Sequence, residues 1–230
     1  MTLELRSYSD YTDVYAKACL SKLLEAVDCP SDYKSAMKDL GKLLGARLLR
    51  DLSTEKSVLV ASTAEDADYL ASGVVDAVAG AISSRVYSAV FWNNHYQVGG
   101  SIGSLAPIVH QYLEPGYNTA KTLVVVKSVI SGSCVVRTNL LRLIEEVDAD
   151  NILIVAPVIH KNSIANLKKE FPKRVSDKFS FVYFAVDEMK DAETGEVKPG
   201  IGGQIYQLLG LGMQPVQTSF IPELVARKFI

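Results

Sequence analysis

Leu123-Val124-Val125-Val126 is the stretch of sequence that decides the fold. Four branched aliphatic residues in a row are typical of a central parallel strand that is covered on both faces. The polar pair Lys127-Ser128 follows this strand, and the spacing of apolar residues predicts a helix at 135–147. A buried strand that leads through a loop into a helix is the repeating unit of an α/β fold.

Strand-like and helix-like stretches alternate on both sides of this segment. Short apolar runs predict strands at 58–60, 86–91, 152–156 and 179–185, and helical patterns lie at 69–81 and 163–171. This alternation predicts an α/β fold in which a mostly parallel twisted sheet is flanked by helices. Ligands of such sheets bind outside the carboxyl ends of the strands, which singles out the loops after residues 60, 91, 126 and 185.

Two helices are expected before the first of these strands. Apolar residues recur at helical spacing between 20 and 27 and again between 33 and 48, and Pro30 separates the two stretches. We therefore expect an N-terminal helical extension at 1–34 and a main domain at 35–230. No linker-like or low-complexity stretch divides the chain further.

The composition is that of an ordinary globular protein. Of the 230 residues, 48% are hydrophobic and 22% are charged, and the formal net charge is −2, so no nucleic-acid or membrane partner is expected. The three cysteines form no paired pattern, which is typical of a reducing compartment and unlike a zinc site or a disulfide framework. Since the N-terminus also lacks a basic and apolar leader, a cytoplasmic protein is expected.

Four stretches of the sequence, one of them the strand at 123–126, match the motifs of one known family in order and spacing over roughly residues 35 to 212. They are Leu40-Gly41-Lys42-Leu43-Leu44 with 49–55, the strand at 123–126 with Ile130-Ser131-Gly132-Ser133, the segment from Val155-Ala156-Pro157 to Pro172, and Ala185-Val186-Asp187 with Pro199-Gly200-Ile201-Gly202. Together they resemble the uracil phosphoribosyltransferase family. The resemblance implies a type I phosphoribosyltransferase fold, usually dimeric. It also implies transfer of ribose 5-phosphate from phosphoribosyl pyrophosphate (PRPP) to N1 of uracil, with release of pyrophosphate.

The loop after the first core strand, at 61–68, departs from this family. Where the family carries an Arg-Ala-Gly turn for pyrophosphate, this loop has neither arginine nor glycine and holds three carboxylates. Like charges a few Å apart repel by roughly 1 kcal/mol even in water. Glu65, Asp66 and Asp68 are candidates for Mg²⁺ or amine binding, or for a general base. The alternative is that Thr63 or Ser62 caps a helix with an acidic first turn.

The loop after the strand at 123–126 keeps more of what a phosphate needs. Where the family places an aspartate for a ribose hydroxyl, this chain has Lys127 and then Ser128, and a lysine cannot accept a hydrogen bond. Ser131-Gly132-Ser133-Cys134 still precedes the expected helix, so free amides, two hydroxyls and Lys127 can hold a phosphomonoester. A helix N-cap without a ligand is the alternative. Cys134 is likewise open to two interpretations, a reactive thiol or an inert buried one.

The segment that matches the family's base-recognition hairpin keeps the family's glycine and proline pattern, but the side chains that follow it differ. After Pro199-Gly200-Ile201-Gly202 the family continues with Asp-Ala-Gly-Asp-Arg, whereas this chain has Gly203-Gln204-Ile205-Tyr206-Gln207. The family reads uracil partly through backbone groups of this hairpin. The resemblance therefore leaves as base-binding candidates Val197, Pro199, Gly200, Ile201, Gly202 and Gly203.

Trp92 and Asn93-Asn94-His95 form an unusual cluster at the carboxyl end of an expected strand, and the polar, glycine-rich stretch at 93–101 predicts a hairpin arm or a mobile loop. The cluster either stacks on a base or forms a hairpin arm of a dimer, and we favour the arm. His95, His110 and His160 lie far apart in the sequence and fit no pattern of metal ligands. No metal site is expected from them.

All three functional loops thus differ from the family together, while the scaffold segments persist. This pattern predicts a divergent relative without uracil phosphoribosyltransferase activity, acting as a dimeric module that binds a nucleotide, a phosphorylated ligand or another protein. The dimer would contain two copies of this chain, or this chain and an intact paralogue. The alternative is an active phosphoribosyltransferase with altered substrate-binding residues that uses Mg²⁺.

Overall fold

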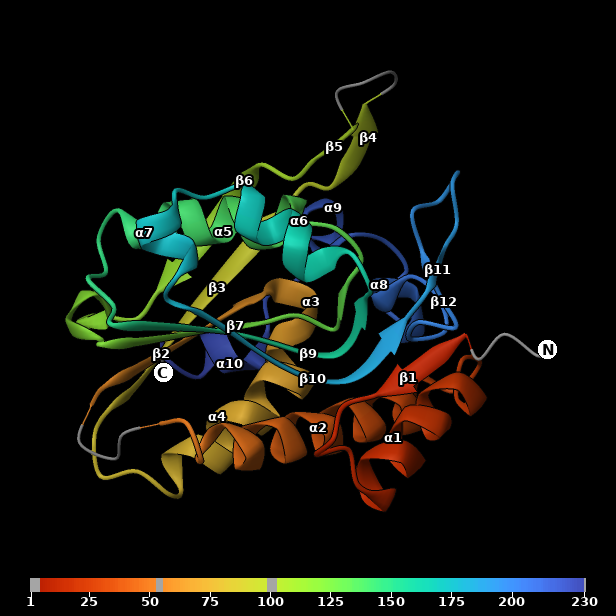
Figure 1. Cartoon of the computed structure of the whole chain (residues 1–230), viewed down its shortest axis with the longest axis horizontal. Coiled ribbons are helices and arrows are strands. Elements are labelled where there is room, and N and C mark those ends of the chain that lie inside the picture. Colours follow the sequence, from red (N-terminus) through yellow and green to blue (C-terminus); the bar gives the residue numbers. More distant parts are fainter. Residues whose placement is uncertain (1–4, 53–55, 99–102, 230) are drawn as a thin grey trace.

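An eight-stranded sheet runs through the centre of the computed structural model, which describes residues 5–52, 56–98 and 103–229 (Figure 1). Its strands are β1 Arg6–Tyr8, β2 Val58–Thr63, β3 Val86–Asn93, β6 Ile108–Leu113, β7 Thr122–Val126, β8 Val129–Ile130, β9 Asn151–His160 and β10 Phe179–Asp187. Along the sheet they follow the order β1–β10–β9–β7–β2–β3–β6, and the short β8 pairs with the end of β9. The edge strands β1 and β6 run antiparallel to their neighbours, and the other pairs are parallel.

β7 is the central strand that the apolar run at 123–126 predicts. It lies between β2 and β9, and all of its residues are buried. Val124 and Val126 point into the hydrophobic core on one face of the sheet, and Leu123 and Val125 point into the core on the other. The expected α/β class, with a mostly parallel sheet flanked by helices, is confirmed.

Helices α1 (Val14–Glu25), α2 (Pro30–Leu48) and α4 (Ser72–Ala79) cover one face of the sheet (Figure 1). α2 and α4 cross closely because glycines occupy the crossing. A Cβ on Gly41 would overlap the carbonyl group of Leu70, and a Cβ on Gly73 would overlap that of Lys38. The short helix α3 (Ala64–Asp66) and a π-helical turn (Ala67–Ala71) join β2 to α4. The crossing therefore holds the turn that follows β2.

Helices α5 (Cys134–Ile144), α6 (Ser163–Lys169) and α7 (Lys173–Ser176) cover the opposite face (Figure 1). Leu140 and Leu143 of α5 and Leu167 of α6 are fully buried in the core on this face of the sheet. The helices expected at 135–147 and 163–171 are thus present. None of the helices in the described ranges is both long enough and apolar enough to cross a membrane.

β1 connects the beginning of the chain to its late segments. Arg6 forms a bidentate ion pair with the carboxylate of Asp187, in which Nε lies 2.6 Å from Oδ1 and Nη2 lies 2.7 Å from Oδ2. The Tyr33 hydroxyl on α2 donates to the carbonyl of Ile201 at 2.9 Å. The boundary expected at residue 34 falls inside α2, whose residues on both sides of that point share one core with α1.

Two hairpins and a C-terminal tail complete the fold. β4 (Tyr96–Val98) pairs with β5 (Gly103–Leu105), and β11 (Met189–Lys190) pairs with β12 (Val197–Lys198). The hairpin expected in the polar stretch is present, although residues 99–101 lie outside the described ranges, as do 53–55. A 3₁₀ turn (Tyr117–Thr119) precedes β7, and the tail carries α8 (Ile205–Leu208), α9 (Pro215–Thr218) and α10 (Glu223–Ala226).

Candidate functional site

The order of the parallel strands reverses between β2 and β7. From β2 the chain moves to β3 on one side, and the later strands β7, β9 and β10 follow on the other. Open parallel sheets bind ligands at the carboxyl ends of the strands beside such a reversal. A cleft of about 560 Å³ lies there, lined by the turns after β2 and β7, the loop before α5, residues of both hairpins and the start of the tail.

An ion cluster of Lys127, Asp66 and Glu65 lies at the reversal. Lys127 Nζ is 2.6 Å from Asp66 Oδ2 and 3.3 Å from Glu65 Oε1, and the side chains of Lys127 and Asp66 are 11% and 1% exposed. Thr63 stands at the N-cap of α3, but its hydroxyl donates to Asp66 at 2.9 Å instead of accepting from a backbone amide. The Ser128 amide donates to the same Asp66 oxygen at 3.3 Å.

The two carboxylates keep the Lys127 ammonium charged. Burial alone would lower the pKa of Lys127, but the charges of Asp66 and Glu65 more than offset burial, so the pKa lies above its ordinary value. An ammonium held by two carboxylates has little capacity left for a phosphate. Lys127 therefore lines the cleft as a neutralised group, not as a free anion ligand.

Asp68 points away from this cluster. Its two carboxylate oxygens accept hydrogen bonds from the amides of Glu223 at 3.0 Å and Leu224 at 2.9 Å, at the start of α10. Burial raises the pKa of Asp68, and the two amides oppose that shift. Of the three candidate carboxylates, the structure brings Glu65 and Asp66 together and joins Asp68 to the tail.

The loop at 131–134 offers free amides beside an ammonium. The amides of Gly132, Ser133 and Cys134 donate no hydrogen bond within the described part of the chain, and they lie at the positive end of α5. Lys190 on β11 extends over them. Its Nζ donates to the Ser131 carbonyl at 3.1 Å, and a Cβ on Gly132 would lie 3.7 Å from the same nitrogen. The amides and the ammonium together form a site for an anion.

Two side chains of this loop are engaged elsewhere. The Ser133 hydroxyl donates to Glu170 at 3.1 Å, and the Cys134 thiol donates to the carbonyl of Ser104 at 3.1 Å. Ser131, Gly132 and Cys134 line the cleft, as does the buried Ser128. Of the two hydroxyls expected from the sequence, that of Ser133 is therefore taken by Glu170, and this loop presents its main-chain amides and the Ser131 side chain to the cleft.

The six base-binding candidates divide into two groups. Val197, Ile201 and Gly203 line the cleft, whereas Pro199, Gly200 and Gly202 do not. Instead, the Gly200 amide donates to Asp187 at 2.7 Å and its carbonyl accepts from Arg6 at 2.6 Å. The Arg6–Asp187 ion pair between β1 and β10 thus anchors the segment after β12, whose neighbouring residues line the cleft.

Further polar residues line the cleft, among them His95, Glu196, Gln204 and Tyr206. Gln204 Nε2 donates to Glu196 Oε1 at 2.6 Å. Burial, and then the charge of Glu65, raise the pKa of Tyr206, so its hydroxyl stays protonated. Burial, and then the charge of Lys127, lower the pKa of His95, so its ring is neutral near pH 7.

Trp92 faces away from the cleft. Its indole Nε1 donates to the carbonyl of Phe220 at 2.7 Å, and the ring lines a different cavity beneath the tail. Asn93 and His95, from the same polar cluster, do line the cleft. Stacking on a ligand in the cleft is therefore not a role for Trp92.

The carboxylates do not form a metal-ligand set. Within residues 5–52, 56–98 and 103–229, no three His, Cys, Asp or Glu side chains gather as a metal ion requires. Glu65 and Asp66 are already paired with Lys127. The arrangement is that of a buried salt bridge.

Lys190 is the candidate anion-binding side chain that the sequence reasoning missed. It lies 59 residues from Ser131 in the chain, so no local pattern connects the two. One signal pointed to it: Lys190 follows the strand expected at 179–185, in one of the four loops that the sheet rule singles out.

Comparison of the sequence with protein-family models and with curated proteins finds no match. Among solved structures, the AQ2163 protein from Aquifex aeolicus matches with a TM-score of 0.66 and 14% identity, over 87% of this chain and 96% of that one. This likeness shows a shared fold.

Phosphoribosyltransferase structures also match, less completely. The hypoxanthine phosphoribosyltransferase of Staphylococcus aureus has a TM-score of 0.38 and 14% identity, over 55% of this chain and 64% of that one. The adenine phosphoribosyltransferase of Thermoanaerobacter pseudethanolicus has a TM-score of 0.37 and 9% identity, over 63% and 79%. The specific link to the uracil family stays a prediction.

Proposed function

We propose that the chain binds a small phosphorylated ligand, such as a nucleotide, in the cleft beside β2 and β7, without transferring a phosphoribosyl group. The observation that carries this proposal is the position of Lys190, whose ammonium lies over the free amides at the start of α5. A phosphate at this point meets amide donors and a positive charge together. Such charge-assisted hydrogen bonds are the strong ones in proteins.

The remainder of the ligand would lie against the β11–β12 side of the cleft. Val197 and Ile201 offer apolar surface there, and the Gln204–Glu196 pair offers both a donor and an acceptor. A volume of about 560 Å³ is in the range of pockets that enclose one small molecule. A base or another ring of similar size fits this combination.

The ion cluster of Lys127, Asp66 and Glu65 is the reason for proposing that no phosphoribosyl group is transferred. Transfer from PRPP needs cationic donors for pyrophosphate and a carboxylate for the ribose, and here Lys127 takes the carboxylate's place. Glu65 and Asp66 are both paired with that same lysine, and the three charges together leave the cluster no positive charge for an anion. The cleft thus keeps a site for one phosphate group, but it lacks the cationic groups that would bind the two phosphates of the pyrophosphate.

Calorimetric titration tests the phosphate site directly. Ribose 5-phosphate and uridine monophosphate should bind, and uridine should bind more weakly than its phosphate. Lys190→Met should weaken both phosphorylated ligands by about tenfold or more, because it removes a charge-assisted hydrogen bond. Lys198→Met is the matched control, since Lys198 lies on the same hairpin, pairs with Asp191 and stands outside the cleft. Equal affinities of the wild-type protein and Lys190→Met would contradict the assigned site.

Two further measurements test the rest of the proposal. Titration with PRPP, with and without Mg²⁺, followed by addition of uracil, asks whether pyrophosphate is released; its release would contradict the non-transferring assignment. We also propose that the chain forms a dimer, with itself or with a paralogue, as the family resemblance implies. Light scattering of the pure protein tests self-association.

A further inference from the structure

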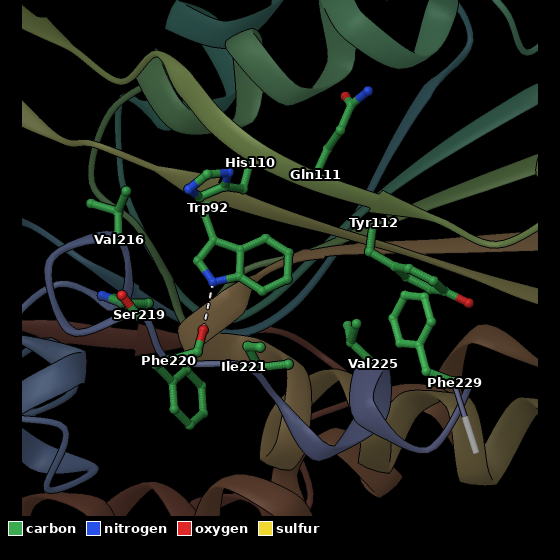
Figure 2. Close-up of a pocket in the computed structure, with 11 residues that line it drawn as sticks. Trp92, His110, Gln111, Tyr112, Val216, Ser219, Phe220, Ile221, Val225 and Phe229 are labelled. Atoms are coloured by element: carbon green, nitrogen blue, oxygen red, sulfur yellow. Dashed lines mark hydrogen bonds between the residues drawn. The ribbon is translucent and has the colours of Figure 1, made fainter.

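A second cavity, of about 370 Å³, lies between the β3–β6 edge of the sheet and the C-terminal tail (Figure 2). The strands supply Trp92 and Tyr112, and the tail supplies Phe220, Ile221, Val225 and Phe229. Figure 2 shows the indole of Trp92 and the rings of Tyr112 and Phe229 around the same space. The cavity and the cleft share one wall residue, Pro215.

The wall of this cavity selects for an uncharged aromatic ligand. None of its described lining residues is charged, and burying a charge among them would be costly. Tyr112 and Phe229 meet edge to face, with ring centroids 5.7 Å apart. Flat rings pack favourably against aromatic walls of this kind. The volume suits one small molecule.

Polar side chains of the wall, among them His110 and Ser219, are available to such a ligand. Trp92 is satisfied by the Phe220 carbonyl, and Gln111 accepts from Arg142 on α5 at 3.0 Å. In contrast, the side chains of His110 and Ser219 make no hydrogen bond to another described residue. An imidazole and a hydroxyl both donate and accept, so they fit a heteroaromatic ring with a polar atom at its edge.

The tail that closes this cavity also contacts the cleft. Gln214, at the start of α9, exchanges two hydrogen bonds with the backbone of His95, at 2.9 Å and 2.8 Å. His95 and Gln214 both line the cleft. The other end of the tail is held by Asp68, two residues from Asp66 of the ion cluster. A ligand that moves the tail therefore acts on two sides of the cleft.

We propose that this cavity is a second ligand site, for a small uncharged heteroaromatic molecule, and that its occupancy changes the affinity of the cleft. The site itself stands on the cavity and its chemistry. The coupling rests in addition on the proposed function of the cleft, so the two parts are tested separately.

The protein carries its own reporter of the site, because Trp92 is the only tryptophan of the chain and lies in the cavity wall. Coumarin, an uncharged bicyclic heteroaromatic molecule that absorbs tryptophan emission, is the probe. Titration of the full chain should quench Trp92 emission to a plateau, as saturable binding requires. Quenching that rises linearly without a plateau reports collisions only and would overturn the site.

A pair of variants locates the binding. Ile221 lines the cavity and is 63% exposed at its rim, so Ile221→Lys should leave the fold intact while placing a charge at the mouth. It should weaken coumarin by about tenfold. Met213→Lys is the matched control, since Met213 belongs to the same tail, is 55% exposed and lines neither cavity nor cleft. Equal coumarin affinity in both variants would overturn the site.

The coupling is tested with ribose 5-phosphate as the cleft ligand. Its affinity, measured by calorimetry, should change several-fold in saturating coumarin and should not change in the Ile221→Lys variant. An unchanged affinity overturns the coupling. Saturable quenching without any binding of ribose 5-phosphate instead contradicts the function proposed for the cleft. A stable dimer that Ile221→Lys dissociates, with no saturable quenching, would show that a second copy occupies the cavity and would overturn the proposal.

Discussion

Lys127 stands between two carboxylates, and one of them, Asp66, is almost completely buried. Removing one partner of a buried ion pair leaves an uncompensated charge, which costs about 3–5 kcal/mol. Lys127→Met should therefore lower the free energy of unfolding by an amount of this order, measured in urea. Adding Asp66→Asn should recover most of the loss, because the buried charge is then gone.

The control for this prediction is an ion pair on the surface. Lys38 and Asp76 lie 3.3 Å apart with both side chains largely exposed, so Lys38→Met should change stability very little. If Lys127→Met were as mild as Lys38→Met, the cluster would not be the buried ion pair described above.

The residue scale also shows where sequence reasoning ends. The sequence placed Glu65, Asp66 and Lys127 near one another, because each follows a strand at the same edge of the sheet. It could not show that Lys127 is held by carboxylates 61 and 62 residues away while Lys190 carries no such partner in the described ranges. Which lysine is free to bind an anion depends on distances that only the folded chain sets.

At the scale of elements, the crossing of α2 and α4 supports the turn that carries the ion cluster. Gly41→Ala would push a methyl group into the Leu70 backbone, and overpacking of this kind costs about 1–3 kcal/mol. Thermal and urea unfolding should both report the loss. Gly80→Ala, at the end of α4, is the control. Its Cβ would meet the Asp76 carbonyl oxygen at 3.3 Å and that of Ala77 at 4.0 Å, so stability should stay within about 1 kcal/mol of wild type.

The long elements were predictable and the short ones were not. The strands that became β2, β3, β7 and β9 are largely apolar runs buried on both faces, which is a strong signal, and β10 is an apolar run that is buried in part. β1, β11 and β12 have two or three residues each, too few for any periodicity, and they are strands because a partner strand lies beside them. β6 is an edge strand that exposes Val109, His110 and Gln111, so its sequence resembles a loop.

At the scale of the whole molecule, acid should destabilise the fold. Burial, reinforced by the charges of Lys190 and Lys161, lowers the pKa of His160 below its ordinary value of 6.5, and a hydrogen bond to the Glu188 backbone opposes this only in part. As the pH falls below 6.5, His160 takes up a proton in the unfolded chain before it does so in the folded chain. The free energy of unfolding therefore falls as the pH falls from 6.5 to the lower pKa of the folded state.

His160→Gln should flatten this part of the pH dependence, measured as the free energy of unfolding in urea at a series of pH values. Lys38→Met, which changes an exposed lysine that stays charged throughout this pH range, is the control and should leave this part of the pH profile as it is in the wild-type protein. A profile that His160→Gln does not alter would show that other groups cause the acid sensitivity.

The pairing of β1 with β10 has a consequence for how the protein is made. Arg6 and Asp187 are 181 residues apart, and the carboxylate that receives Arg6 also holds the hairpin that lines the cleft. At about 5–20 residues per second, a ribosome needs roughly 10 to 40 seconds to cover that distance. During this interval the first strand has no partner, and β10 is an open edge until β1 docks on it. The first strand thus stays unpaired until β10 has been made, and the cleft cannot be completed before β10 and the hairpin that follows it are synthesised.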